Sequence, residues 1–411
     1  MKKTALIAGA TGVAGYSLTH HLANQTDWHV IAIARDCSNL SHLADQVTLI
    51  ESDLNNLADL EMKLRPYSVS YLFYTAWVNP PGGIPGSEEN MVHPMKLQRQ
   101  LAFTTRWIVP QLKRSRRLHD VFYRGFARAS GNYDPENRNR SMLKNITDVL
   151  EQPPHQLEHV ALLTGGKFYG MHMGPGIYPG FKIPFTEDQP SHPGFNIYAA
   201  SEEYVQNELD QPVTWSIVRP TFIIGQSPKP SQNIGYGLAI YAWLMKASGQ
   251  KLVFPAGWKA YRAIGQYSDA SLLAQMMTWS AKDPAATNQI FNLVNGDVVS
   301  WEQIWPWLGE YFDMEIAIPD EGADLNVLLA DRKSAWKQIC EQHQLPHQSL
   351  ESVFSGNFLA ASVALTWDAE YSMEKARRHG FESSIATEQM FSNLFGQLEA
   401  DQIIPPKPTK S

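Results

Sequence analysis

A glycine-rich turn near the start of the chain has the residue types and spacing needed to bind a phosphate. Residues 9–15 read GATGVAG, directly after the apolar stretch at residues 4–8. The glycines allow a tight turn, a close approach of the backbone to a pyrophosphate, and close packing of the next helix on the strand. An ordinary strand–turn–helix gives the same pattern, so the turn alone does not decide. As a dinucleotide site, it would use Gly9, Thr11, Gly12, Val13 and Gly15.

Three further apolar strands are predicted at residues 28–34, 47–50 and 69–74. In parallel α/β sheets, ligands bind at the carboxyl ends of the strands. We therefore expect a nucleotide to contact the residues that follow these strands. They are Arg35, Asp53, Leu54, Thr75, Ala76 and Trp77.

The residue types at the second and third strand ends bear on the cofactor. A guanidinium at Arg35 suits a 2′-phosphate and so favours NADPH. The neighbouring Asp36 would repel that phosphate, and NADH stays open as an alternative. Asp53 is expected at the adenine edge, although a strand-end turn explains an aspartate there equally well.

The spacing of the apolar segments predicts the elements that position these residues. Four short strands with helix-like spacers between at least the first three fit βαβ units and a parallel sheet. Residues 159–163 and 214–218 are two more strand candidates, and a helix is expected over residues 198–209. The predicted fold class is α/β, a Rossmann-type doubly wound parallel sheet with a smaller, mostly helical C-terminal part.

Composition excludes several classes of protein. The net charge of −7 argues against a nucleic-acid-binding protein. Two cysteines, Cys37 and Cys340, form no disulfide framework and suit a reducing cytoplasm. The sequence contains no run of 18 or more apolar residues, so no membrane-spanning helix is predicted. It also contains no spacing of residues typical of metal ligands. The start MKKTALIAGA is similar to a secretory signal, but a strand entering the glycine turn is the favoured interpretation.

A second candidate for chemistry is Tyr198, in the stretch FNIYAASEEYV at residues 195–205. A tyrosine in this setting is typical of short-chain dehydrogenase active sites, which read Y-x-x-x-K. Here Glu202 stands where that lysine is expected. The stretch is therefore no catalytic site, or an inactive one, or a site whose lysine comes from elsewhere in the chain.

An ordered set of short motifs favours the third alternative. The chain resembles the progesterone 5β-reductase and iridoid synthase-like (PRISE) enzymes, an atypical branch of the extended short-chain dehydrogenases. The motifs run in the family order and cover nearly the whole chain, and the set is more specific than any one of them. They are GATGVAG, WHVIAIAR, SDL, YLFYTAWVN, LLTGGKFY, PFTED, WSIVRPTFIIG, QYSDASLLA, FNLVNGDVVSWEQIW and SMEKARRHGF.

The resemblance implies where the missing lysine lies. The family places it in a strand-end motif T-G-x-K, which residues 164–167 match with Lys167. An acidic residue four places after the tyrosine is within the family pattern. The family commonly has two adjacent tyrosines, and this chain has Ile197 followed by Tyr198, so Tyr198 takes the catalytic role. The implied activity is NADPH-dependent reduction of the C=C bond of an enone or enal.

This reaction develops negative charge on the carbonyl oxygen, and a positioned hydrogen-bond donor stabilises that charge. We expect the Tyr198 hydroxyl to be the donor, and the Lys167 ammonium to strengthen it and orient the cofactor ribose. By the same resemblance, the nicotinamide end is expected at Thr164, Pro220, Thr221 and Ile223. The substrate walls are expected at Phe168, Tyr169, Met173 and Tyr178.

The chain is expected to divide into two parts. The dinucleotide-binding domain takes residues 1–230 and residues 263–298. The substrate-binding part takes residues 231–262 and 299–404, and residues 405–411 form a flexible tail. An insertion relative to the family is expected at about residues 80–135.

Within this insertion, residues 96–128 carry nine Lys or Arg and only one acidic residue, Asp120. A solvated face of amphipathic helices is the favoured interpretation of this basic segment. Docking on an acidic partner, a membrane face and a lid over the substrate are the alternatives.

Other functions stay open on the sequence alone. A carbonyl reductase, epimerase or isomerase could use the same Tyr–Lys pair. An NADP-sensing protein that docks a partner through the basic segment is the alternative of another class. A small-molecule enone or enal is the expected partner, and a homodimer is an assembly left open.

Overall fold

The structure is a computed structural model that describes residues 2–78, 135–176, 178, 180–192, 196–228, 233–319, 329, 331–346 and 349–407. The basic segment at residues 96–128, and all but the last residue of the predicted insertion, lie outside these described residues.

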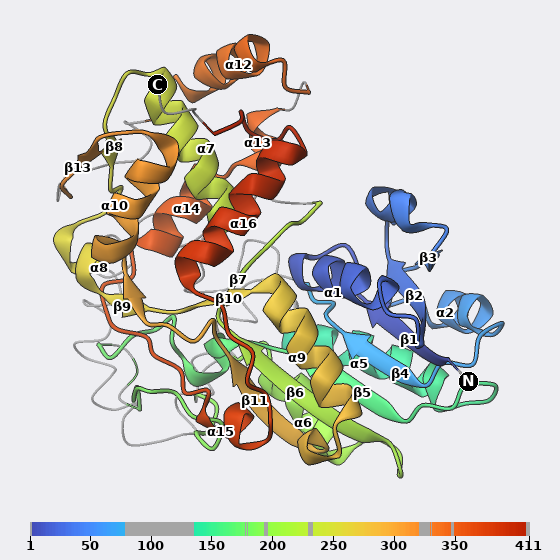
Figure 1. Ribbon diagram of the computed structural model, residues 1–411. Coiled ribbons are helices and arrows are strands. Elements are labelled where there is room, and N and C mark those ends of the chain that lie inside the picture. Colours follow the sequence, from blue (N-terminus) through green and yellow to red (C-terminus); the bar gives the residue numbers. More distant parts are fainter. Residues whose placement is uncertain are drawn as a thin grey trace, which may run out of the picture.

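A seven-stranded parallel sheet forms the centre of the N-terminal part (Figure 1). Its order, β11-β6-β5-β4-β1-β2-β3, is the 3-2-1-4-5-6 order of doubly wound dinucleotide-binding sheets with β11 added at one edge. The predicted fold class is confirmed, and the N-terminal stretch is a central strand. The strands are β1 Lys3–Ala8, β2 Trp28–Ala34, β3 Val47–Glu51, β4 Tyr71–Tyr74, β5 His159–Leu163, β6 Thr214–Pro220 and β11 Gln289–Leu293.

Helices cover both faces of this sheet, which explains why apolar residues predominate on both faces of its strands. Successive residues of a strand point to opposite faces. Ile7 and Phe73 belong to the apolar cluster on the face that α1 and α9 cover, and Leu6 and Leu72 to the cluster under α5 and α6. The first face carries α1 Val13–Ala23, α9 Ala270–Lys282 and the short α15 Glu374–Arg378, and the second carries α2 Leu57–Leu64, α5 Pro135–Leu150 and α6 Ala199–Asn207.

A third apolar cluster holds the C-terminal helices together and contains buried Trp301, Trp305 and Trp336. Its helix α7 begins at Ile234, where the Asn233 side chain caps it by accepting from the Gly235 amide (2.9 Å). The helices are α7 Ile234–Ala247, α8 Trp258–Arg262, α10 Trp301–Phe312, α12 Arg332–His343, α13 Leu350–Val353, α14 Gly356–Val363 and α16 Thr387–Ala400.

Three two-stranded ladders accompany these helices. The pair of β7 and β10 lies where the main sheet meets the C-terminal helices (Figure 1). The predicted domain boundaries stay a prediction, but β11 and α9, both from residues 263–298, lie in the main sheet and on its face. The pairs are β7 Phe222–Ile224 with β10 Tyr267–Asp269, β9 Ile264–Gly265 with β12 Val299–Ser300, and β8 Leu252–Val253 with β13 Ile316–Ala317.

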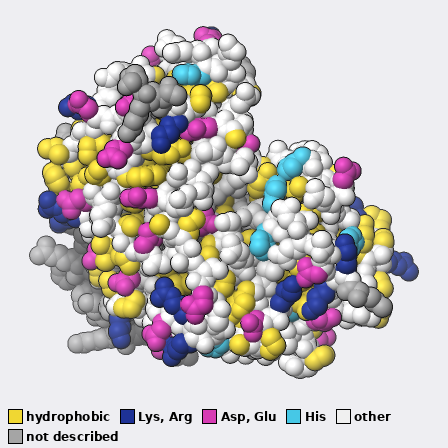
Figure 2. All heavy atoms as spheres, in the orientation of Figure 1, with side chains coloured by type: hydrophobic (Ala, Val, Ile, Leu, Met, Phe, Trp, Pro, Cys, Tyr) yellow, Lys and Arg dark blue, Asp and Glu magenta, His cyan; other side chains and the backbone are white. Residues whose placement is uncertain are grey.

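The face of the molecule shown in Figure 2 carries mixed charge. In Figure 2, basic and acidic side chains alternate over the face shown, and neither sign forms a continuous field. None of the helices in the described part of the chain has both the length and the apolar character required to cross a bilayer.

Candidate active site

The glycine turn between β1 and α1 leaves space at one of its three glycines. Gly9 has a φ of +85°, and a Cβ added to it would lie 2.6 Å from the Ala76 nitrogen. A Cβ added to Gly15 would lie 2.3 Å from the Gly9 oxygen. At exposed Gly12, the nearest heavy atom would be the Gly9 oxygen at 3.5 Å. No described side chain caps the N-terminus of α1. The turn therefore fits a pyrophosphate at Gly12, where the amides and the dipole of α1 favour an anion.

The other predicted cofactor residues follow along the same carboxyl edge of the sheet. From β3 to β6, the strand ends carry Asp53, Arg35, the glycine turn, Thr75 to Trp77, residues 164–167 and Pro220. The sheet therefore brings the predicted adenosine end and the predicted nicotinamide end to one edge. The Thr75 hydroxyl donates to the Ala8 carbonyl (2.8 Å) and fixes the end of β4 against β1.

At the predicted adenosine end, the two acidic side chains accept hydrogen bonds from backbone amides two residues further along the chain. Asp53 accepts from the Asn55 amide (2.9 Å) and side chain (2.7 Å), so it forms a strand-end turn. Its pKa is lowered chiefly by that amide, with the Arg35 charge adding. The Asp36 carboxylate accepts from the Ser38 amide (3.0 Å). Arg35 is exposed at the end of β2, and Leu54 is buried beside Asp53.

Tyr198 lies at the carboxyl ends of β5 and β6. A Cβ added to Gly165 would lie 3.1 Å from the Tyr198 hydroxyl oxygen and 3.4 Å from the Pro220 carbonyl oxygen. The Trp77 ring, 38% exposed, lies 5.8 Å from the Tyr198 ring between centroids. The fold thus gathers these predicted residues at one place, although they come from four different strand ends or helices.

Lys167 lies two residues beyond the glycine that the Tyr198 hydroxyl approaches. It belongs to the 3-10 turn η2, Gly166–Tyr169, and is half-buried. Burial, with the Lys167 and His192 charges adding, lowers the pKa of His172 well below its ordinary value.

Glu202, at the position where a catalytic lysine is expected, forms buried polar contacts of its own. It is 1% exposed and forms a buried ion pair with Arg219, whose Nε donates to it at 3.0 Å and whose Nη2 donates at 2.5 Å. The Thr164 hydroxyl donates to the same carboxylate at 2.7 Å. Burial is the largest single effect on the pKa of Arg219 and lowers it, but the charges and hydrogen bonds of Glu202 and Tyr169 together raise that pKa above its ordinary value. Glu202 therefore ties α6, whose N-cap residue is Tyr198, to the ends of β5 and β6.

The pair extends to the edge strand β11. Arg219 also donates to the Tyr169 hydroxyl (2.9 Å), which donates to the Asn292 side-chain oxygen (2.6 Å). The guanidinium lies 3.5 Å from the centroid of the Phe168 ring. Phe168 and Tyr169, both predicted as substrate walls, are thus buried against Arg219. The sequence reasoning missed the roles of Arg219 and Asn292, and the only signal was a charged residue inside the apolar strand WSIVRP.

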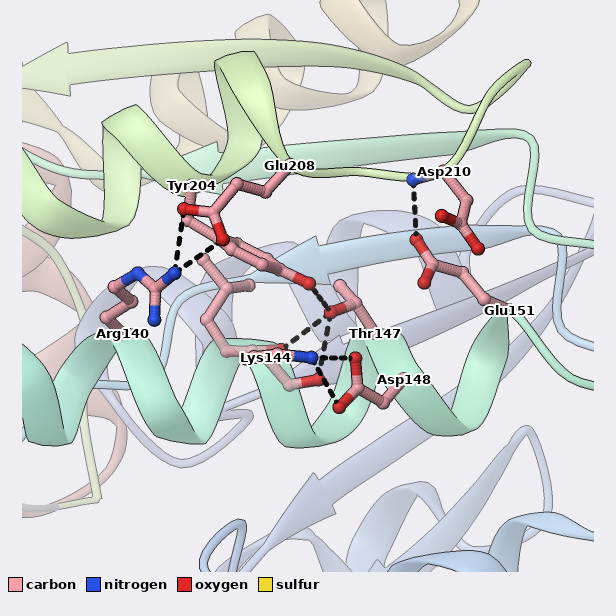
Figure 3. Close-up of polar contacts among 9 residues, drawn as sticks. Arg140, Lys144, Thr147, Asp148, Glu151, Tyr204, Glu208 and Asp210 are labelled. Atoms are coloured by element: carbon pink, nitrogen blue, oxygen red, sulfur yellow. Dashed lines mark hydrogen bonds and ion pairs between the residues drawn. The ribbon is translucent and has the colours of Figure 1, made fainter.

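Helix α5 fixes the far side of α6 (Figure 3). The Thr147 and Tyr204 hydroxyls are hydrogen-bonded at 2.6 Å, and Arg140 pairs with Glu208 at 2.6 Å. The Glu151 carboxylate accepts from the amide just after α6, at residue 210 (3.1 Å). These contacts set the position of the helix from which Tyr198 reaches the sheet.

The predicted nicotinamide end is anchored to the segment that contains β10. The Thr221 amide donates to the Ser268 hydroxyl (2.9 Å), and the Thr221 hydroxyl donates to the Gln266 carbonyl (2.7 Å). Ile223 pairs with Ser268 across β7 and β10. The other two predicted wall residues, Met173 and Tyr178, are half-buried in the loop after η2.

These features define a dinucleotide-binding Rossmann protein of the extended short-chain dehydrogenase type. A family model described as "PRISE-like Rossmann-fold domain" matches residues 93–405, and one for the "NAD dependent epimerase/dehydratase family" matches residues 5–94. The chain belongs to the PRISE-like family, and the resemblance found in its motifs is confirmed.

Named relatives support this assignment, and solved structures show the same fold. The chain is 29% identical to a 3-oxo-Δ(4,5)-steroid 5-β-reductase of Arabidopsis thaliana, over 98% of this chain and 94% of the relative. It is 27% identical to an (S)-8-oxocitronellyl enol synthase of Catharanthus roseus, over 98% of this chain and 93% of that relative. The Bordetella bronchiseptica enzyme WbmG in complex with NAD shares the fold, with a TM-score of 0.60, 12% identity and coverage of 98% and 96%. UDP-glucose 4-epimerase of Thermotoga maritima also shares the fold, with a TM-score of 0.58 and 13% identity. The match covers 97% of this chain and 99% of the epimerase.

Proposed function

We propose that this protein is a nicotinamide-dependent oxidoreductase that reduces the C=C bond of α,β-unsaturated carbonyl compounds. The similarity to a steroid 5-β-reductase and to enol synthases over nearly the whole chain supports this substrate class. The observation that carries the proposal is the Tyr198 hydroxyl beside Gly165 and Pro220, at the edge that holds the glycine turn.

A dinucleotide fits the residues along this edge. The glycine turn and the α1 amides would hold the pyrophosphate, and Thr164, Pro220, Thr221 and Ile223 would hold the nicotinamide end. We propose NADPH rather than NADH, because Arg35 is exposed at the end of β2 and Asp36 is engaged by the Ser38 amide. When bound, the cofactor supplies the hydride.

The chain's own residues would stabilise the charge that the reaction creates. Tyr198 would donate a hydrogen bond to the substrate carbonyl oxygen as it becomes an enolate oxygen. Lys167 would strengthen the Tyr198 hydroxyl as a donor. Trp77, whose ring lies beside the Tyr198 ring, would limit the access of water to that hydroxyl. Protonation of the α-carbon can come from solvent. With two cysteines in 411 residues, the chain suits a reducing compartment, and we propose the cytoplasm.

Turnover of a simple enone tests the proposed reaction. With 2-cyclohexen-1-one, we expect the protein to oxidise NADPH and to form cyclohexanone, as identified by gas chromatography. Simple saturated ketones are the matched controls and should oxidise no cofactor. Formation of 2-cyclohexenol, or reduction of saturated ketones but of no enone, would overturn the proposal in favour of a carbonyl reductase.

The cofactor preference has a separate test. Arg35→Ala should weaken NADP⁺ binding by about 10- to 100-fold, because it removes a charge-assisted hydrogen bond to the 2′-phosphate, and should leave NAD⁺ binding nearly unchanged. Arg65→Ala, at the far end of α2, is the control. Isothermal titration gives the dissociation constants, and equal losses for both nucleotides would exclude a 2′-phosphate contact.

A further inference from the structure

A pair of histidines at the surface lies outside the proposed active site. His20 is in the last turn of α1, and His42 is in the 3-10 turn η1, Ser38–Leu43, which follows β2. Their Nε2 atoms lie 3.0 Å apart, although the two residues are 22 positions apart in the chain. Histidine side chains are visible together on the face of the molecule above these elements (Figure 2). The fold therefore brings two imidazoles to one place.

The His20 ring is held in one orientation. Its Nδ1 lies 2.9 Å from the Tyr16 carbonyl oxygen, which can only accept, so Nδ1 carries the hydrogen and donates. The Tyr16 ring also packs against the His20 ring, with 4.2 Å between the centroids. The Nε2 atom of neutral His20 therefore presents its lone pair toward His42.

This arrangement is typical of a histidine that binds a metal. Metal-bound histidines usually donate their other ring N–H to a carboxylate or a backbone carbonyl, which fixes the ring and makes it a better ligand. Burial lowers the pKa of His20 more than the hydrogen bond to the Tyr16 carbonyl raises it, and His42 lowers it further. The neutral form, which is the form that binds metal, is thus favoured at neutral pH.

The distance between the two Nε2 atoms suits a shared metal ion. Imidazole nitrogens lie about 2.0–2.1 Å from a divalent metal, so two of them stand about 2.9 Å apart at a right angle and about 3.4 Å apart at a tetrahedral angle. The observed 3.0 Å is nearer to the right angle. Right angles between nitrogen ligands are typical of tetragonal Cu²⁺ and Ni²⁺ sites.

The same distance also serves a hydrogen bond from Nε2 of His42 to Nε2 of His20. A metal would replace that hydrogen, and His42 would then carry its hydrogen on Nδ1. His42 is exposed, so water can accept from Nδ1 after this change. The pair can therefore exchange a hydrogen bond for a metal with little movement of either ring.

The surroundings of the pair indicate a stabilising site rather than a catalytic one. Within the described ranges of the chain, no group of three or more His, Cys, Asp or Glu side chains is suited to a metal, so water would fill the other positions. A rise of about 1.5 Å per residue places His20 about 12 Å along α1 from Gly12, which lies at the proposed cofactor edge. A metal here would cross-link α1 to η1 without reaching the proposed site of hydride transfer.

We propose that His20 and His42 form a binding site for a divalent transition-metal ion, Cu²⁺ or Ni²⁺, which stabilises the folded protein. This site is independent of the proposed reductase activity. The two histidines share no sequence motif, and their rings approach each other (5.2 Å between centroids) only because α1 lies beside η1.

Titration of the untagged protein with Ni²⁺ tests the site, with isothermal calorimetry as the measurement. We expect one ion per chain. His20→Gln and His42→Gln should each weaken binding at least about tenfold, because each removes one of two ligands. His21→Gln is the matched control, since this neighbour on α1 is hydrogen-bonded to Gln25 instead (2.8 Å) and should leave the affinity unchanged.

Two further measurements separate the paired site from binding to a single histidine. Pulsed electron paramagnetic resonance of the protein with one equivalent of Cu²⁺ should show two coupled imidazoles. Ni²⁺ at about 100 times its dissociation constant should raise the melting temperature of the wild type by about 3 °C, and that of His42→Gln by less than about 1 °C.

Several outcomes would overturn the inference. They are equal Ni²⁺ affinity of His42→Gln and the wild type, a single coupled imidazole, and loss of binding in only one of the two variants. His42→Gln decides the matter if His20→Gln is destabilised, because His42 is exposed and its replacement leaves the core intact. None of these measurements uses an enone, so their failure is distinct from failure of the proposed function.

Discussion

At the scale of single residues, Glu202 explains why the tyrosine motif lacks its lysine. A lysine at this position could not pair with Arg219, which is 2% exposed and already bound to the carboxylate. The glutamate instead joins Thr164 and Arg219, so it helps to hold the two strand ends that frame Tyr198. The residue that looked like a missing catalytic group is thus part of the support of the site.

Restoring the apparent consensus should therefore damage the protein. Glu202→Lys leaves Arg219 buried beside a second positive charge, and loss of one partner of a buried pair costs about 3–5 kcal/mol of unfolding free energy. The neighbouring exposed change, Glu203→Lys, should stay within about 0.5 kcal/mol of the wild type. Urea denaturation measures both. Equal stability of the two variants would show that the ion pair does not support the fold.

The Tyr198 hydroxyl has its own test. Tyr198→Phe should lower kcat/KM for 2-cyclohexen-1-one by about 10²–10³-fold, because one oxyanion donor is lost. The dissociation constant for NADPH should stay within about twofold, as fluorescence titration can measure. Tyr67→Phe is the control and should keep wild-type kinetics. Full activity of Tyr198→Phe would remove this hydroxyl from the mechanism.

At the scale of elements, the β1–turn–α1 unit contains two kinds of glycine. Gly9 and Gly15 are required by the close packing of the fold, and Gly12 is open to a ligand. The sequence predicted the unit and its three glycines, because the pattern of apolar strand, glycine spacing and helix is local. It could not tell the glycines apart. That difference depends on Ala76 and Thr75, which arrive from β4 and crowd Gly9 and Gly15.

The two kinds of glycine should respond differently to alanine. Gly12→Ala should stay within about 1 kcal/mol of the wild type in unfolding free energy but weaken NADP⁺ binding at least about tenfold. Gly15→Ala should lose at least about 1–3 kcal/mol of stability, because its Cβ meets the Gly9 oxygen. Denaturation and calorimetric titration of each variant give the two quantities. A destabilised Gly12→Ala with unchanged affinity would contradict this assignment.

At the scale of the whole molecule, the seven-stranded sheet depends on polar contacts that the sequence did not reveal. His159, at the start of β5, is 3% exposed and bonds to the Thr214 and Ser216 hydroxyls (both 2.9 Å). Ser216 also bonds to Ser280 of α9 (3.0 Å). Strand positions could be predicted because burial follows from apolar runs. Cross-strand polar pairing could not, because it depends on which strands become neighbours.

This buried histidine gives a pH dependence of stability. Burial, with the Lys3 charge adding, lowers the pKa of His159 to about 3, against about 6.5 for an unfolded chain. Between these values the unfolded state binds one proton more, so His159 makes the unfolding free energy fall by about 1.4 kcal/mol per pH unit as pH decreases. His159→Gln should lose that part of the slope between pH 6 and 4.5.

The comparison needs a control because other histidines also titrate. His29→Gln, at an exposed position of β2, should keep the wild-type slope. Urea denaturation across this pH range measures the three slopes. Identical slopes for His159→Gln and the wild type would show that His159 is not held neutral in the folded protein.

The candidate site mixes what the sequence can and cannot predict. Tyr198, Lys167 and the glycine turn belong to short motifs, so their types and strand-end positions could be predicted. The Glu202–Arg219 pair could not, because Arg219 meets the carboxylate only when β6 packs beside α6.

The most direct test of the central claim is the destination of the hydride. NADPH carrying deuterium at nicotinamide C4, prepared as each of its two stereoisomers, should transfer the label from one of them to 2-cyclohexen-1-one. We predict cyclohexanone with deuterium at its β-carbon, observed by mass spectrometry and NMR. Deuterium at the carbonyl carbon of an alcohol product would contradict the account, because the protein would then reduce C=O rather than C=C.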